Sequence, residues 1–95
     1  MEEPIILGPL EIAPAEYRAK YDDRELQLTR KEFDLLTLFA RNPRRVLRRP
    51  QIAQLVWGGE VHGRTIDIHV SRLRRRLPQG AIETVTGVGY RIAIL

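Results

Sequence analysis

Short apolar segments separated by turn residues dominate the first part of the chain. Apolar runs at residues 5–7 and 10–12 flank a Gly-Pro pair, which is a common turn sequence. Residues 17–21 and 25–28 then alternate apolar with polar side chains, which is the period of a half-buried strand. The pattern therefore predicts four short antiparallel strands over residues 5–28.

The period changes to that of a helix at Thr29. Thr29 and Glu32 have the spacing of a capping box, which satisfies the first free amides of a helix. The apolar residues that follow recur at helical spacing: Phe33, Leu36, Phe39 and Ala40. We expect a first helix from about Arg30 to Arg41, ended by Asn42-Pro43, because proline cannot continue the helical hydrogen bonds.

A second, shorter helix is predicted after an extended link at residues 46–48. Pro50 suits the first helical position, because the N–H that proline lacks has no helical partner there. The apolar side of this helix is expected to consist of Ile52, Leu55 and Val56. Two glycines follow Trp57, so the helix should end near that residue.

A third helix and a hairpin complete the pattern. The helix is expected over residues 64–77, where Pro78 ends it. Residues 81–95 are typical of two strands joined by a turn at Gly87-Val88-Gly89. The apolar residues on either side of that turn are Ile82, Val85, Tyr90, Ile92 and Ile94.

Four strands, three helices and a hairpin indicate an α+β domain. The 95 residues, 43% of them hydrophobic, are enough for one domain with a thin core. We assign residues 5–95 to this domain and residues 1–4 to a tail or the end of a linker. The chain has no cysteine, and no apolar run approaches the ~20 residues that a membrane helix needs, so a cytoplasmic domain is expected.

The two parts of the chain carry opposite net charge. Residues 1–40 contain five Lys/Arg and nine Asp/Glu, whereas residues 41–95 contain eleven Arg and three acids, giving net charges of −4 and +8. This asymmetry indicates one surface that attracts a polyanion and one that avoids it. A solvated basic face would give the same composition, so charge alone does not identify nucleic acid as the partner.

The cationic residues gather on one side of the third helix. At about 100° per residue, a narrow apolar stripe should face the core: Ile66, Val70, Leu73 and Leu77. The opposite side carries Arg64, Ile68, Ser71 and Arg75, with Arg72 on its flank. Such a helix fits the major groove of DNA, where Arg72 and Arg75 would read guanine or grip phosphate and Ile68 would touch a thymine methyl. An exposed isoleucine without any role is also common.

Other polar residues of this helix suggest separate roles. His69 lies one turn after Thr65 on a flank that phosphates would approach, or is a plain surface histidine. With only one other histidine and no cysteine, neither a metal site nor a cofactor is expected. Asp67, the only acid of the helix, is expected to orient Arg64 or Arg74, or to cap a backbone amide.

Four motifs in sequence order resemble a known family. They are Thr29-x-x-Glu32-Phe33-x-Leu35-Leu36, then Val56-Trp57-Gly58, then the run from Arg64 to Arg74, then Thr84-Val85-Thr86-Gly87-Val88-Gly89-Tyr90. Together they resemble the OmpR/PhoB-type effector domain, the output module of two-component response regulators. The resemblance covers nearly the whole chain. It implies a winged helix-turn-helix fold with an N-terminal four-stranded antiparallel sheet, three helices and a C-terminal β-hairpin wing.

The resemblance also implies where double-stranded DNA would be contacted. Residues 64–77 would be the recognition helix in the major groove, and its matching contact positions are Arg64, Thr65, His69, Arg72 and Arg74. Trp57 matches a family position that touches the DNA backbone. Thr84 and Tyr90 match wing positions that lie near phosphate. Family members bind direct repeats as head-to-tail pairs. Some contact RNA polymerase through the loop that here contains Gly59, Glu60, Val61 and His62.

Two departures from the family pattern modify these expectations. The wing position that often carries an arginine for the minor groove is Thr86 here, and Arg91 is expected to contact phosphate instead. No receiver domain lies within the 95 residues. We therefore expect an output domain that is monomeric when isolated and follows a receiver domain in the full-length protein, or else a stand-alone regulator.

Other functions fit the sequence less well. An enzyme is disfavoured, because the chain has no nucleophile–base–acid set and no glycine-rich phosphate loop before a helix. RNA binding is disfavoured, because the narrow major groove of RNA excludes a helix. The alternative is a winged-helix protein-interaction module without DNA contact, which would lack the steep salt dependence of DNA binding.

Overall fold

The N-terminal sheet contains the four strands that the alternating pattern predicts. The computed structural model of the protein describes residues 3–94. The strands are β1 (Ile5–Leu7), β2 (Leu10–Ala13), β3 (Arg18–Tyr21) and β4 (Arg24–Glu25), antiparallel and in that order across the sheet. One face of the sheet is buried through Leu10, Ile12 and Ala19.

Two details of this sheet differ from the prediction. Tyr17 is not a strand residue: it follows a 3-10 turn (Pro14–Glu16) in the left-handed conformation, with φ 52°. The proline of that turn fixes its first position and so interrupts the extended chain. The fourth strand is Arg24–Glu25 rather than residues 25–28. Two aspartates with positive φ form a tight turn that pairs Tyr21 with Arg24 and so moves the start of the strand forward by one residue.

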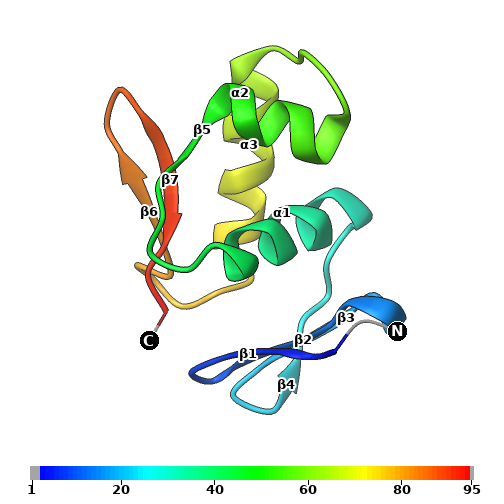
Figure 1. Cartoon of the computed structure of the whole chain (residues 1–95). Coiled ribbons are helices and arrows are strands. Elements are labelled where there is room, and N and C mark those ends of the chain that lie inside the picture. Colours follow the sequence, from blue (N-terminus) through cyan, green and yellow to red (C-terminus); the bar gives the residue numbers. More distant parts are fainter. Residues whose placement is uncertain (1–2, 95) are drawn as a thin grey trace.

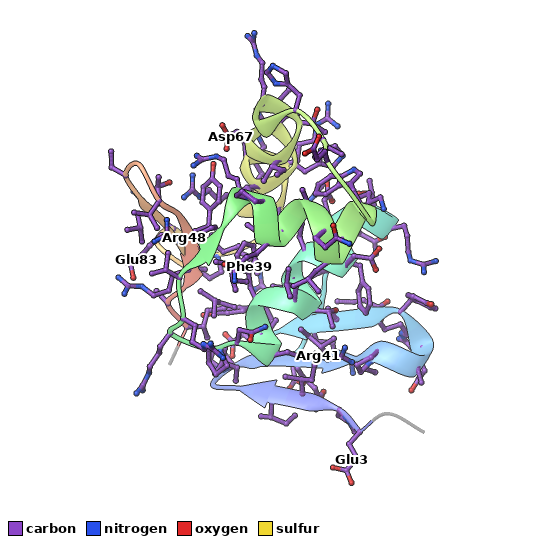
Figure 2. All side chains as sticks on the ribbon, turned by 45° about the horizontal axis from the view of Figure 1, so that its top comes forward. Glu3, Phe39, Arg41, Arg48, Asp67 and Glu83 are labelled. Atoms are coloured by element: carbon purple, nitrogen blue, oxygen red, sulfur yellow. The ribbon has the colours of Figure 1, made fainter. Side chains whose placement is uncertain are left out.

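Helix α1 (Arg30–Arg41) begins and ends where predicted. The Thr29 hydroxyl accepts a hydrogen bond from the Glu32 amide at 3.2 Å, and the Glu32 carboxylate accepts one from the Thr29 amide at 3.0 Å. The Asn42 side chain donates to a carbonyl of the last turn at 2.9 Å. Phe39, on the apolar side of α1, is fully buried at the centre of the molecule (Figure 2).

The second helix differs in its second half from the prediction. Helix α2 (Arg49–Ile52) continues into a π-helical turn (Ala53–Trp57). Ile52 is fully buried and Val56 is partly buried, but Leu55 is 64% exposed. The prediction that Leu55 faces the core is therefore wrong. The wider winding advances each residue by a smaller angle than an α-helix does, which carries Leu55 away from the side of Ile52.

Helix α3 (Gly63–Arg74) starts one residue earlier and ends three residues earlier than predicted. A ring nitrogen of His62 accepts a hydrogen bond from the Arg64 amide at 3.1 Å and caps the start. Residues 75–77 continue in tighter turns, because the residue before a proline is disfavoured in the α-helical region. The predicted apolar stripe is confirmed, since all four of its residues are buried: Ile66, Val70, Leu73 and Leu77.

The C-terminal hairpin is part of a sheet with one more strand than predicted. Strands β6 (Ile82–Val85) and β7 (Gly89–Ile92) form the hairpin, and β5 (Leu47–Arg48) pairs with β7. We call these three strands the wing sheet. The sequence indicated only an extended link at β5, because two residues are too few to show a period. Gly89 permits the pairing, since a Cβ there would lie 1.9 Å from the Leu47 carbonyl oxygen.

The two sheets lie on different sides of the helices (Figure 1). Helix α1 lies between the N-terminal sheet and α3, and the hairpin of β6 and β7 stands beside α3. Helix α2 is at the end of the molecule farthest from the N-terminal sheet. Within residues 3–94, the structure has no helix long and apolar enough to cross a membrane.

Candidate nucleic-acid interface

The outer side of α3 is exposed and cationic, as its sequence predicts. Its exposed residues are Arg64, Ile68, Ser71, Arg72, Arg75 and Arg76. Ile68 is 43% exposed among these arginines. No hydrogen bond or ion pair within residues 3–94 holds the guanidinium groups of Arg64, Arg72 or Arg75. These groups are therefore free to reach a ligand while the opposite side of the helix is anchored in the core.

A histidine and a tryptophan stack on one flank of this helix. The His69 Nδ1 lies 2.8 Å from the Thr65 carbonyl oxygen, and because a carbonyl only accepts, Nδ1 carries the proton. The Trp57 and His69 rings meet edge to face, with their centroids 5.2 Å apart. Lys31 places its ammonium 5.5 Å from the centre of the Trp57 ring. Thr65 and His69 thus lie together on one flank, as predicted, and Trp57 packs against His69.

Asp67 joins α3 to two other elements through a single carboxylate. Its Oδ1 accepts a hydrogen bond from Arg49 Nε at 2.8 Å and another from the Tyr90 hydroxyl at 2.5 Å. The prediction that Asp67 orients Arg64 or Arg74, or caps a backbone amide, is therefore wrong about its partner. Arg49 was not predicted, because it lies 18 residues away in sequence and only the tertiary fold brings it to α3.

The pKa values of this cluster follow from its contacts. Burial pushes the pKa of Asp67 upward, but hydrogen bonds from Tyr90 and Arg49, with the charges of Arg49 and Arg74, leave it below its usual range. Burial and the hydrogen bond to Asp67 raise the pKa of Tyr90. The hydrogen bond to Asp67 also raises the pKa of Arg49. The cluster therefore favours a carboxylate, a guanidinium and a neutral phenol over a wide range of pH.

The hairpin brings two predicted residues to α3. Arg74 donates from Nε to the Ile82 carbonyl at 3.1 Å and from Nη2 to the Thr84 hydroxyl at 2.5 Å. Its guanidinium carbon also lies 5.3 Å from the centre of the Tyr90 ring. Tyr90 is only 4% exposed, so its aromatic ring is part of the core, while its hydroxyl is bonded to Asp67.

Arg91 lies on the other face of the wing sheet. It pairs with Glu83, directly across from it on β6, at 3.3 Å. Because side chains alternate along a strand, Arg91 points away from Tyr90. The structure therefore separates Arg91 from the cluster of Arg74 and Thr84.

The loop between the second and third helices packs against α2. Gly59, Glu60 and Val61 line an open cavity of about 510 Å³ together with Pro50 and Gln54. Val61 packs against the core, whereas Glu60 is exposed. His62 of the same loop caps α3. Among residues 3–94 there is no group of three or more His, Cys, Asp or Glu side chains that could hold a metal ion.

Comparison with known proteins gives a consistent result. Residues 23–92 match the family model described as "Transcriptional regulatory protein, C terminal". The chain is 40% identical over 88 residues to regulatory protein VanRB of Enterococcus faecalis, covering 90% of this chain and 40% of that protein. It is 36% identical over 99 residues to the phosphate regulon transcriptional regulatory protein PhoB of Escherichia coli, covering 98% and 43%. The chain thus spans less than half the length of these curated relatives.

Solved structures share the fold over nearly the whole chain. The Klebsiella pneumoniae RstA DNA-binding domain, in complex with the RstA box, superimposes with a TM-score of 0.88 at 27% identity and covers 97% of this chain and 98% of that one. The DNA-binding domain of CpxR from E. coli has a TM-score of 0.86 at 32% identity, covering 96% of each chain.

Proposed function

Because the chain belongs to the family of C-terminal domains of transcriptional regulatory proteins, of the OmpR/PhoB type, we propose that it binds double-stranded DNA sequence-specifically. It does so as the output domain of a two-component response regulator. The observation that carries this proposal is the exposed side of α3, where unpaired arginines surround Ile68 on a helix whose other side is buried. The RstA relative, solved with its DNA box, supports the same reading.

We assign base recognition to Ile68 in the middle of α3, to Arg72 in its last turn and to Arg75 directly after its end. Arg72 and Arg75 present forked donors that match the two acceptors of guanine in the major groove. Ile68 lies beside them and offers an apolar surface for a thymine methyl. These three side chains point away from the core, so the helix can bring them to base edges without unfolding any contact.

Phosphate contacts surround this centre. The residues we assign to them are Arg64, Thr65, His69, Arg74, Trp57, Thr84, Tyr90 and Arg91. Arg74 and Thr84 share one hydrogen bond, and the Trp57 and His69 rings pack edge to face, so each pair presents a fixed arrangement to the DNA backbone. Such contacts fix the register of the helix but carry no sequence information.

The larger assembly follows from the same proposal. Residues 5–95 form the binding domain and residues 1–4 a linker end, with a receiver domain elsewhere in the full-length protein. The isolated domain is monomeric, and two copies bind direct repeats head to tail. The loop at residues 59–62 contacts RNA polymerase. The domain works in the cytoplasm and is not an enzyme.

Selection of bound duplexes from a random pool tests the function. A DNA-binding output domain should enrich a short motif, and affinity for it should fall steeply with salt, by about 0.9 in log–log slope per phosphate neutralised. If no motif is enriched and binding to any duplex is absent at low salt, the proposal fails. That result would favour a winged helix whose arginines meet an acidic protein.

A further inference from the structure

One cluster of polar side chains joins three elements of the fold. Arg49 lies at the start of α2, Asp67 on α3, and Tyr90 on β7. Each contacts the other two: Asp67 accepts from both, and Arg49 Nη2 donates to the Tyr90 oxygen at 3.3 Å. We call these three residues the Asp67 latch. Because the contacts close a triangle, no one of the three elements can turn without breaking two of them.

The ring of Tyr90 is held from two directions. The guanidinium carbons of Arg49 and Arg74 lie 5.0 and 5.3 Å from its centre, within the range of cation–π attraction. Arg74 is itself bonded to the Ile82 carbonyl and the Thr84 hydroxyl. The hairpin is thus joined to α3 by the Asp67–Tyr90 bond and by Arg74 a little farther along the helix.

The charge of Asp67 makes this arrangement unexpected on a DNA-binding surface. Its side chain is 45% exposed, on the side of α3 that faces the hairpin (Figure 2). A carboxylate there repels phosphates and lowers affinity for any duplex. A surface selected only for attraction to DNA would lack it. Its benefit must therefore come from the geometry that it imposes.

We infer that Asp67 is a positioning residue: by holding Arg49 and Tyr90 it fixes the angle between α3 and the hairpin, and so increases discrimination between specific and non-specific DNA. A specific duplex must meet the helix and the hairpin at the same time. With the angle fixed in the free protein, both meet their contacts together. Non-specific binding depends mainly on net positive charge and needs no fixed angle. This inference rests on the proposed function.

The variant that separates geometry from charge is Asp67→Asn. It removes one negative charge and weakens the bonds to Arg49 and Tyr90 while keeping the shape of the side chain. Affinity for a scrambled duplex should stay the same or rise, whereas affinity for the selected duplex should fall. The affinity for the selected duplex divided by that for the scrambled duplex should drop about ten-fold or more, as expected for the loss of a charge-assisted hydrogen bond.

Glu83→Gln provides the matched control. Like Asp67, Glu83 is paired with an arginine, in its case Arg91, but it lies on the outer side of the hairpin (Figure 2). Removing its charge should strengthen binding to both duplexes by one factor and leave their ratio unchanged. If Asp67→Asn behaves in the same way as Glu83→Gln, Asp67 is merely a charge and the inference is overturned.

Amide hydrogen exchange in the free protein tests the latch without DNA. In Asp67→Asn, the exchange rates of the β6 and β7 amides should rise by a larger factor than those of the α1 amides, which report the stability of the whole domain. Tyr90→Phe, which keeps the buried ring and removes only the hydroxyl, should give the same exchange result. Unchanged exchange in both variants contradicts the latch. If the unaltered chain binds no duplex, the proposed function fails, and the exchange measurement still decides whether the latch orders the hairpin.

Discussion

Arg72 and Arg64 both project from the exposed side of α3, and neither guanidinium group has a partner in the described part of the chain. Their positions along the helix differ. Arg72 lies in the last turn of α3 and Arg64 lies at its start. Arg72 lies between Ile68 and Arg75, the two other residues that we assign to base edges, whereas Arg64 lies outside that set, next to the loop before α3. The two arginines should therefore respond differently to substitution.

Replacing Arg72 with alanine should weaken binding to the selected duplex by about 1–3 kcal/mol and relax preference at one base position. Replacing Arg64 with alanine should weaken all duplexes alike and lower the salt slope by about 1. Titrations against a set of single-base variants of the selected site measure both effects. Retained discrimination in Arg72→Ala, or altered base preference in Arg64→Ala, would reverse the two assignments.

The lowered pKa of Asp67 has a consequence for acid stability. Because the folded pKa lies below that of the unfolded chain, the unfolded state binds more protons in acid. The stabilisation is thus present above the unfolded value of about 3.9 and is lost as the pH falls toward the folded pKa. Urea unfolding of the unaltered chain and Asp67→Asn should show a stability difference near neutral pH that shrinks through this window. A difference that is independent of pH would contradict the assignment.

At the scale of elements, the wing sheet depends on a close approach at Gly89. Replacing Gly89 with alanine forces the new Cβ against the Leu47 carbonyl oxygen and should separate β5 from β7. We expect a loss of about 1–3 kcal/mol in the free energy of unfolding, as for other overpacked sites. Denaturant unfolding measures the loss directly.

Gly59→Ala is the control for this substitution. A Cβ at Gly59 meets nothing within 4 Å, and its backbone has no positive φ. Its stability should therefore stay close to that of the unaltered chain. Equal losses in the two variants would show that the contact with Leu47 is not the cause.

The sequence predicted the elements whose cause is local. Thr29 and Glu32 cap α1 through neighbouring atoms, and the apolar stripe of α3 follows from periodicity, so both were predictable. Elements that depend on distant partners were not. Strand β5 exists because β7 lies beside it, and Leu55 turns outward because the end of the second helix winds more widely.

The same division applies to the candidate site. The outward side of α3 was predictable, because it is the side opposite a buried stripe. The partner of Asp67 was not, since Arg49 reaches it from another helix. A lone acid in a basic helix was the available signal, and it indicated that a partner was needed without indicating which one.

For the whole molecule, the separation of charge along the chain becomes a separation in space. The acidic N-terminal part supplies the four-stranded sheet, and the arginine-rich part supplies α3 and the wing sheet. One domain buries a small interface on DNA, so its affinity alone should be modest. A duplex with two direct repeats should bind two copies cooperatively, so that the second copy binds more tightly than a single copy binds a duplex with one repeat. A binding curve that ignores the second repeat would argue against the head-to-tail pair.

Sequence-specific binding by this domain depends above all on one feature: the arginine side of α3 enters the major groove. Replacing single guanines of the selected duplex with 7-deazaguanine removes one acceptor in that groove and leaves the minor groove and the phosphates unchanged. With the substitution at one or more positions, the unaltered chain should bind the substituted duplex more weakly than the parent duplex. At that position, Arg72→Ala should bind the two duplexes equally. If every substituted duplex binds the unaltered chain as tightly as the parent, the helix does not read the major groove.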